Sequence, residues 1–168
     1  MHYQSILESV AADVAPLVGG GRVADYIPAL ARVPIQQFGI ALYAVDGQQA
    51  AAGDARTPFS IQSVSKVLGL TLGLQTLGSS LWDRIGREPS GNAFNSLLLT
   101  CGTYDAAGEF AFKVGVPCKS GVGGAIVAVV PGQMVLCAWS PGLDETGNSM
   151  AARRALELFV TRTGVSVF

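Results

Sequence analysis

The stretch from Ile61 to Leu77 constrains the fold of this chain most, because it has the pattern of a helix that is apolar in nearly every direction. Apolar side chains recur around the whole helical turn, at Val64, Val67, Leu68, Leu70, Leu72, Leu74 and Leu77. A helix of this kind is normally buried on all sides. The sequence therefore predicts a fold in which other elements pack around residues 61–77, with Gly78 marking the end of the helix.

A possible nucleophile stands at the start of this helix. Ser63 and Lys66 are three residues apart, so their side chains lie on one face. A neutral lysine can take the proton of a serine hydroxyl and activate it without a histidine. Ser60 is a suitable N-cap, which would place Ser63 in the first turn, where backbone N–H groups lack intrahelical partners. The same spacing also fits a capped surface helix, so the spacing alone leaves both interpretations open.

The only histidine is His2, close to the start of the chain, which effectively excludes a Ser-His-Asp triad.

A second motif, Lys-Ser-Gly-Val-Gly-Gly, occupies residues 119–124 and leads into the apolar run 125–130. The β-branched residues of that run predict a buried strand. Glycines allow a strand backbone to approach a ligand closely, although the motif alone also fits an ordinary glycine-rich turn. Ser-x-x-Lys on a helix followed by Lys-Ser/Thr-Gly at the start of a strand is typical of serine β-lactamases and penicillin-binding proteins.

The chain resembles the serine-dependent glutaminases of bacteria and mitochondria, which share the β-lactamase-like fold. The matching stretches extend over nearly the whole chain: Gly21–Leu30, Val45–Gly47, Gly53–Asp54, Phe59–Val67, Glu88–Gly91, Phe94–Asn95, Thr103–Tyr104, Gly108–Phe110, Lys119–Gly124, Trp139–Pro141 and Gly147–Ser149. The resemblance implies hydrolysis of the side-chain amide of L-glutamine to L-glutamate and ammonia, through a glutamyl ester on the serine.

The resemblance also assigns roles to individual residues. Ser63 would be the nucleophile and Lys66 the group that activates it, while Tyr26 would shuttle protons or donate to the oxyanion. The residues implied to bind substrate are Tyr104, Gln62 and Val122, whose backbone N–H would form an oxyanion hole with that of Ser63. No metal and no cofactor are implied. Without the resemblance, both tyrosines would be taken for ordinary buried tyrosines.

Members of that family are close to twice as long as this chain. The match is continuous to about Leu97 and resumes at about Leu98, so a middle helical domain is missing. In the family that domain contributes an Asn-Ala-Gly-Ala loop and other groups that line the glutamine pocket. We therefore expect residues 1–168 to form one truncated glutaminase-like α/β domain with impaired activity, and one face of the helix 61–77 to lack cover.

The remaining periodicities predict the fold class. Residues 4–17 and 149–162 are expected to be helices, the second with Asn148 as its N-cap and Gly164 after its end. Residues 40–45 and 48–52 predict one hairpin, and residues 125–130 and 134–139 predict another. This order indicates an α/β (α+β) fold with an antiparallel sheet flanked by helices, as in the α/β half of the β-lactamase/DD-peptidase-like fold.

Composition limits the partners. A net charge of −1 gives no basic surface for nucleic acid or anionic lipid, and no apolar stretch reaches the roughly 18 residues of a membrane span. The first residues lack the pattern of a signal peptide, and Cys101, Cys118 and Cys137 have no metal-ligand spacing. These features predict a cytoplasmic protein with reduced thiols.

Only 14% of residues are charged and the mean hydropathy is +0.41. Exposed apolar surface is therefore expected where the missing domain would pack, and with it a homo-oligomer.

Three functions remain open at this stage. The first is a glutaminase acting on L-glutamine, and the second is a β-lactamase or D-alanyl peptidase relative, disfavoured because no Ser-Asp-Asn occurs. The third is a non-catalytic remnant of the same fold that associates through its exposed face.

Overall fold

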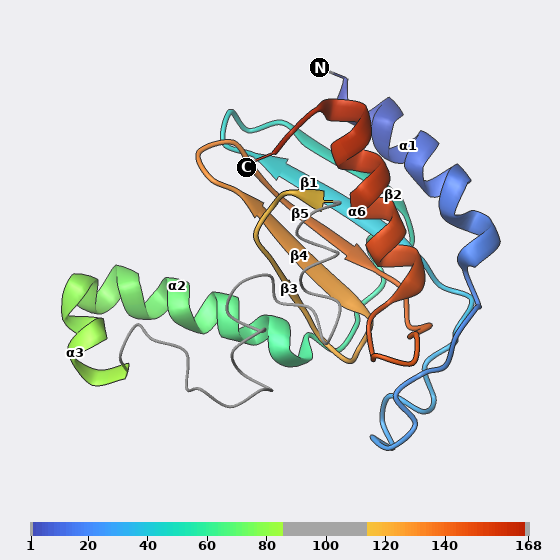
Figure 1. Ribbon diagram of the computed structural model, residues 1–168, viewed down its shortest axis with the longest axis horizontal. Helices are drawn as coiled ribbons and strands as arrows, with labels where there is room; N and C mark the ends of the chain where they lie inside the picture. The colour runs from blue at the N-terminus through green and yellow to red at the C-terminus, as the bar shows by residue number, and fades with distance from the viewer. Residues whose placement is uncertain (1, 86–113, 167–168) are drawn as a thin grey trace.

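The computed structural model describes residues 2–85 and 114–166, and the structural statements below concern these residues (Figure 1). Its elements in chain order are α1 (Tyr3–Val14), η1 (Ala15–Leu17), β1 (Gly39–Ala44), β2 (Gln49–Gly53), η2 (Gln62–Val64), α2 (Ser65–Leu77), η3 (Gly78–Leu81), α3 (Trp82–Ile85), β3 (Cys118–Ser120), β4 (Ala125–Val130), β5 (Met134–Trp139) and α6 (Met150–Thr163).

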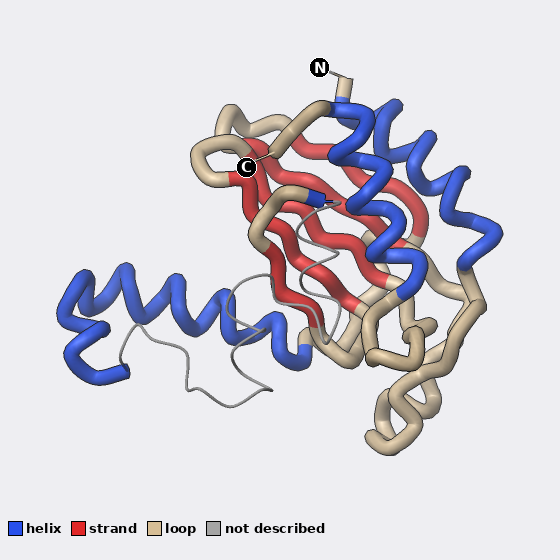
Figure 2. The backbone as a smooth tube through the Cα atoms, in the orientation of Figure 1, coloured by secondary structure: helices blue, strands red, loops and turns tan. Residues whose placement is uncertain are grey.

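The strands form one five-stranded sheet in the order β2-β1-β5-β4-β3, and every neighbouring pair is antiparallel (Figure 2). In register, Ile40 of β1 lies between Ala52 of β2 and Ala138 of β5. Both predicted hairpins are present, and Gly47 and Gly132 adopt positive φ angles of 88° and 69° where their chains turn. The predicted fold class, an antiparallel sheet flanked by helices, is confirmed.

One face of the sheet holds the core. Side chains alternate along the strands: Leu42 of β1 and Leu136 of β5 are buried, whereas their chain neighbours Tyr43 and Val135 are exposed. The buried face packs against α1 and α6, which lie side by side over it (Figure 1). Phe159 of α6, 1% exposed, is the largest fully buried side chain among the described residues. Burial of this apolar layer is the main stabilising contribution to the fold.

Helix α2 differs from α1 and α6. It extends away from the sheet in Figure 1 and contains no buried residue. Five of its leucines are between 37% and 62% exposed: Leu68, Leu70, Leu72, Leu74 and Leu77. The helix is therefore not buried on all sides. One face was expected to lack cover in this chain, and among the described elements α2 packs chiefly against η2 at one end and η3 at the other.

Two predicted helix caps are wrong. Ser60 does not cap the Ser-Lys helix, since its Oγ instead accepts a hydrogen bond from Gln62 Nε2 at 2.7 Å, and Ile61 is the N-cap residue. Helix α6 is capped by Ser149, whose side chain accepts from the Ala152 N–H at 3.3 Å. Asn148 lies one residue too early, in a loop where its own N–H donates to Asp144 Oδ1 at 3.0 Å.

The Lys-Ser-Gly motif also lies differently from the prediction. Lys119 and Ser120 belong to a separate short edge strand, β3, rather than to the start of the strand 125–130. Strand β3 pairs with β4, with Lys119 opposite Val127, so the glycines form the turn between the two strands. Within the described residues, no helix is long and apolar enough to cross a membrane.

Candidate active site

Ser63 lies in the short 3-10 helix η2, directly before α2. The residue before it, Gln62, is the only non-glycine residue with a positive φ angle in the described parts of the chain, at 46°. A side chain in this left-handed region costs on the order of 1–3 kcal/mol, and such strain is concentrated at functional sites. The kink at Gln62 turns the incoming loop into the helix and sets Ser63 at its start.

The glycine-rich loop 121–124 lies against the chain just before Ser63. A Cβ atom on Gly121 would come within 3.1 Å of the Ile61 carbonyl oxygen and 3.4 Å of the Ser63 nitrogen. A Cβ atom on Gly123 would overlap the Ser60 carbonyl oxygen. The two motifs that are far apart in the sequence therefore meet, and at Gly123 a side chain would overlap backbone.

Between these glycines lies Val122, the residue expected to contribute to an oxyanion hole. Its side chain is half-buried, and its N–H donates no hydrogen bond within residues 2–85 and 114–166. A backbone N–H held beside a nucleophile and not used by the fold is the kind of donor that stabilises a developing oxyanion.

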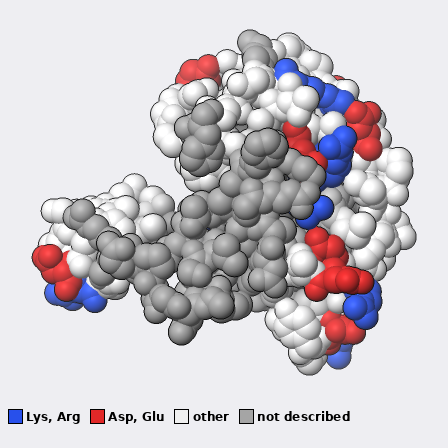
Figure 3. All heavy atoms as spheres, in the orientation of Figure 1, with Lys and Arg blue, Asp and Glu red and all other residues white. Residues whose placement is uncertain are grey.

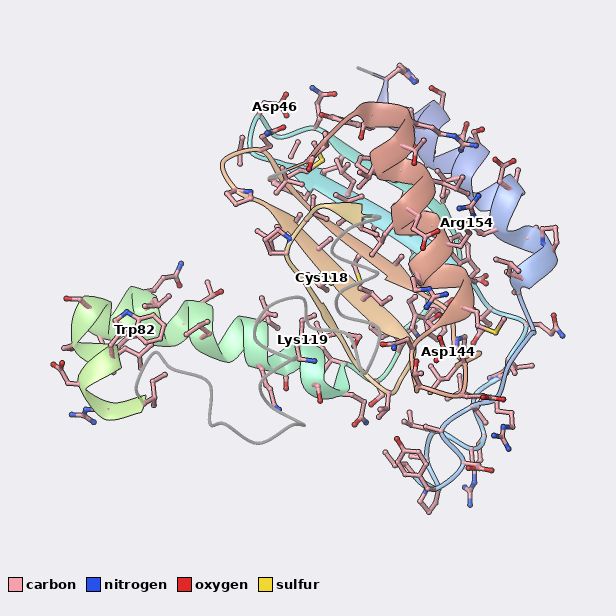
Figure 4. All side chains as sticks on the ribbon, in the orientation of Figure 1. Asp46, Trp82, Cys118, Lys119, Asp144 and Arg154 are labelled. Atoms are coloured by element: carbon pink, nitrogen blue, oxygen red, sulfur yellow. The ribbon has the colours of Figure 1, made fainter. Side chains whose placement is uncertain are left out.

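Two lysines flank this loop. Lys66, in the first turn of α2, is exposed, whereas Lys119 of β3 is only 8% exposed. The Lys119 Nζ donates to the carbonyl oxygen of Ser120 at 2.7 Å, and Figure 4 shows this side chain beside the N-terminal part of α2. Burial, followed by the positive charge of Lys66, lowers the pKa of Lys119 to about 8. A substantial fraction of Lys119 is therefore neutral in mildly alkaline solution.

Lys119 is the residue that sequence reasoning missed. The motif around it was noted, but no role was assigned to its amine. The sequence contained an indication of this role, because Lys119 shortly precedes the continuous apolar strand 125–130. A lysine next to such a strand is rarely buried without a function.

Of the two tyrosines predicted to belong to the site, only Tyr26 lies within the described residues. The side chain of Tyr26 is 70% exposed and forms no hydrogen bond or ring contact with another described residue. Its neighbour Ile27 packs in one small cluster with Leu143 and Val122, so the backbone at Tyr26 lies near the glycine-rich loop although the side chain faces solvent. Tyr104 lies outside the described residues. The structure thus brings together Gln62, Ser63 and the Val122 loop, and does not bring the Tyr26 side chain to them.

An aromatic pair packs against the glycine-rich loop 121–124. Phe59 stacks on Trp139 with ring centroids 5.1 Å apart, and the Trp139 Nε1 donates to the Gly123 carbonyl oxygen at 2.8 Å. A small hollow of about 180 Å³ adjoins them and is lined in part by Ser60 and Gly123. This packing fixes the position of the glycine-rich loop relative to η2.

A larger hollow lies elsewhere on the described surface. It has a volume of about 880 Å³ and opens over β1, β2 and β5, with Tyr43, Asp54 and Cys137 among its lining residues. Its lining contains no serine and no lysine. The chemistry of the residues, rather than the size of the hollow, therefore places the candidate active site at Ser63.

An antiparallel five-stranded sheet with α1 and α6 on one face and Ser63 at the start of a helix beside its edge defines a protein of the β-lactamase-like fold. Solved structures agree. One is described as a probable glutaminase, with a TM-score of 0.81 and 22% identity over 98% of each chain. Another is a Bacillus subtilis glutaminase in covalent complex with 5-oxo-L-norleucine, formed by reaction with 6-diazo-5-oxo-L-norleucine, with a TM-score of 0.82 and 21% identity over 99% of this chain and all of that one.

The sequence comparisons define the family. The glutaminase family model matches residues 21–100 and 95–168. A glutaminase of Paraburkholderia phytofirmans is 32% identical over an alignment of 304 residues that covers all of both chains. A glutaminase of Vibrio cholerae is 32% identical over 300 residues, covering 97% of this chain and 98% of its own. The chain belongs to the glutaminase family. Because it has 168 residues, these alignments contain a long segment of the relatives that has no counterpart here.

Proposed function

We propose that this chain is a hydrolase that converts L-glutamine to L-glutamate and ammonia with Ser63 as its nucleophile. The observation that carries the proposal is the contact between the chain at Ser63 and the Gly121–Gly123 loop. The covalent complex of the Bacillus subtilis protein supports it, because the reagent from which that complex formed has the shape of glutamine. The substrate would be a small molecule, with no nucleic acid or membrane involved.

The proposed chemistry proceeds through an acyl-enzyme. The Ser63 Oγ attacks the carbonyl carbon of the side-chain amide while its proton passes to a neutral lysine amine. The resulting oxyanion accepts hydrogen bonds from the N–H groups of Val122 and Ser63. The carbon–nitrogen bond then breaks, the departing nitrogen takes the proton, and ammonia leaves. Water hydrolyses the glutamyl ester, which releases glutamate and restores the serine, so the sequence balances without a metal or a cofactor.

Two lysines are candidates for the base in this proposal. Lys66 lies on the helical face of Ser63 and is the base predicted from the sequence. Lys119 supports the same role more directly, because its pKa is lowered to about 8 and its neutral form is therefore available. Tyr26 and Tyr104 remain proposed as a proton shuttle and a substrate contact, and Gln62 as a neighbour that helps to hold the substrate.

We also propose that the chain is a single truncated domain that lacks a helical domain near residues 97–98. The two matches of the family model meet at residues 95–100, which supports a break there. Contacts made by remote parts of a pocket position the reacting group, so a missing pocket segment is expected to slow turnover severely. A cytoplasmic location and self-association complete the proposal. Cys137 is a free thiol among the described residues, in keeping with a reducing compartment.

The direct test is ammonia release from L-glutamine by the intact chain, with Ser63→Ala as the matched control and a longer relative as reference. We expect release that depends on Ser63 but is far weaker than that of the relative. Release that is unchanged in Ser63→Ala would contradict the proposal. Hydrolysis of a reporter cephalosporin in place of glutamine would favour the β-lactamase alternative, and inactivity with both substrates would favour the non-catalytic remnant.

A further inference from the structure

Trp139, the last residue of the central strand β5, contacts both halves of the candidate site. Its ring stacks on that of Phe59, which leads into the Ser63 turn, with centroids 5.1 Å apart. Its Nε1 donates to the carbonyl oxygen of Gly123 in the glycine-rich loop at 2.8 Å. The side chain is 3% exposed and packs in one cluster with Val64, the residue after Ser63. Trp139 therefore joins the two segments from a fixed position in the sheet.

The Gly123 carbonyl group that Trp139 binds is the first member of a hydrogen-bonded chain. It shares a peptide group with the Gly124 N–H, which donates to the carbonyl oxygen of Gly121 at 2.9 Å and closes a four-residue turn. The Gly121 carbonyl group in turn shares a peptide group with the Val122 N–H, the candidate oxyanion donor. Two peptide groups therefore connect the ring N–H of Trp139 to the N–H of Val122.

This hydrogen-bonded chain sets the direction of the Val122 N–H. The described residues contain no cis peptide bond, and the C=O and N–H of a planar trans peptide group point in opposite directions. Because the Gly121 carbonyl oxygen points into the turn toward Gly124, the Val122 N–H points out of the turn. It donates no hydrogen bond within residues 2–85 and 114–166, so it can donate to a ligand.

The same hydrogen bonds strengthen the Val122 N–H as a donor. Hydrogen bonds linked through peptide groups polarise one another, by roughly 10–30% per bond. The ring N–H of Trp139 draws electron density from the Gly123 carbonyl group, which makes the Gly124 N–H a stronger donor to Gly121. That second bond has the same effect on the peptide group of Val122. Since the Trp139 side chain is buried, water does not compete with its ring N–H.

We propose that Trp139 is a positioning residue, which directs and polarises the Val122 N–H through the peptide groups between Gly121 and Gly124. It acts through these groups rather than on the substrate. Where turnover is concerned, the proposal rests on the proposed function, in which the Val122 N–H binds the oxyanion. A donor of this kind stabilises the transition state more than the bound substrate, so Trp139 should influence kcat rather than KM.

The test removes the ring N–H of Trp139 and keeps the shape of the side chain. The intact chain is made with the benzothiophene analogue of tryptophan at position 139, in which sulfur replaces the ring N–H. Fluorotryptophan at the same position keeps the N–H and is the matched control.

The benzothiophene analogue at Trp82 is a second control, because Trp82 begins α3, beyond the end of α2 that is opposite to η2 (Figure 4). Lys66, at the start of α2, is the only charged residue of that helix. The visible surface of α2 is accordingly white in Figure 3. No charged group of α2 beyond its first turn therefore carries an electrostatic effect from Trp82 to the loop.

The first readout needs no substrate. Amide hydrogen exchange of Gly124 should become about fivefold faster with the benzothiophene analogue at position 139, the factor expected when one hydrogen bond is lost. The amide proton resonance of Val122 should move upfield, because its peptide group is less polarised. Both controls should keep the wild-type values. Unchanged exchange and resonance, or equal changes with fluorotryptophan, would overturn the proposal.

The second readout is turnover of L-glutamine. With the benzothiophene analogue at position 139, kcat should fall about tenfold, less than the loss expected when an oxyanion donor is removed, while KM changes by less than about twofold. A raised KM with unchanged kcat, or an equal loss with fluorotryptophan, would show that Trp139 only supports the fold. A wild-type chain that releases no ammonia contradicts the proposed function alone, and the Gly124 and Val122 measurements then decide this proposal by themselves.

Discussion

Gly123 lies so close to the carbonyl oxygen of Ser60 that no side chain fits between them. Gly121 makes a similar approach to Ile61 and Ser63, so the glycine-rich loop follows the backbone that leads into the Ser-Lys helix. Val122, between the two glycines, is thereby held close to the backbone at Ser63, the candidate nucleophile, and the Gln62 side chain also lies against the loop. The position of the candidate oxyanion hole depends on this contact between two stretches of backbone.

The substitution Gly123→Ala should therefore separate the loop from η2. We expect a loss of about 1–3 kcal/mol in the free energy of unfolding, because the new methyl group must displace backbone. Covalent labelling of Ser63 by a glutamine-like diazoketone, followed by mass spectrometry, should fall at least tenfold, since losing an oxyanion-hole donor costs on that order or more.

Gly69→Ala is the control for this experiment, because a Cβ atom at position 69 meets nothing within 4 Å. Alanine in a helix interior should keep stability the same or raise it by about 0.5–1 kcal/mol. Equal losses of Ser63 labelling in the two variants would show that the contact at Gly123 has no special role.

Neighbouring residues of β5 allow a test of the core. Leu136 is 2% exposed and faces α1 and α6, whereas Val135 is 44% exposed on the opposite face. Leu136→Ala should cost about 2–5 kcal/mol in the free energy of unfolding, because it leaves a cavity. Val135→Ala should change it by no more than about 0.5 kcal/mol. Denaturant unfolding checks both, and a similar cost for the two would mean that the sheet is covered on both faces.

Most of the fold could be predicted because it follows from local patterns. Apolar runs and the glycine turns predicted the hairpins β1–β2 and β4–β5 close to their observed positions. Strand β3 was not predicted, since three residues are too short to show a period. Ser60 and Ser149 show the limit for caps, because either serine can hydrogen-bond locally and only the path of the chain decides which one meets a helix N–H.

The candidate site was predictable in part for the same reason. The Ser63–Lys66 spacing is local, so a helix fixes it. The burial of Lys119 and the contact of Gly121 with Ser63 are not local, because they depend on how β3 lies beside η2. The exposure of α2 could not be derived from its own residues either. The apolar pattern of a helix is the same whether or not the elements that would pack against it are present in the chain.

Cys137 should be unreactive in the folded chain. Burial raises the pKa of its thiol to about 11, so the thiolate is scarce at neutral pH. Iodoacetamide should label Cys137 slowly in the native protein at pH 8 and rapidly after unfolding in denaturant, with the adducts located by mass spectrometry. Equal rates in the two states would contradict the burial of this side chain.

Lys119 makes two kinds of pH dependence testable. Its pKa in the folded chain is about 8, below its ordinary value of 10.5, with burial as the first cause and the charge of Lys66 as the second. If its neutral amine activates Ser63, labelling of Ser63 should rise with pH and level off above about pH 8. Lys119→Arg keeps a positive charge that does not titrate in this range, so it should abolish that rise. A pH profile unchanged by Lys119→Arg would exclude Lys119 as the base.

Stability should respond to the same group with a definite sign. Between about pH 8 and 10.5 the unfolded chain keeps the Lys119 proton and the folded chain has lost it, so the unfolded state binds more protons. The free energy of unfolding therefore increases with pH in this window, by up to about 1.4 kcal/mol per pH unit. Cys137 acts in the opposite direction between about pH 9 and 11, because its folded pKa is raised. The increase should thus be clearest from pH 8 to 9.

Lys119→Met should be more stable than wild type at pH 7 and should lose the increase, while Lys66→Met should reduce it only in part. Denaturant unfolding at each pH measures these differences, and an increase of equal size in Lys119→Met would show that another group is responsible.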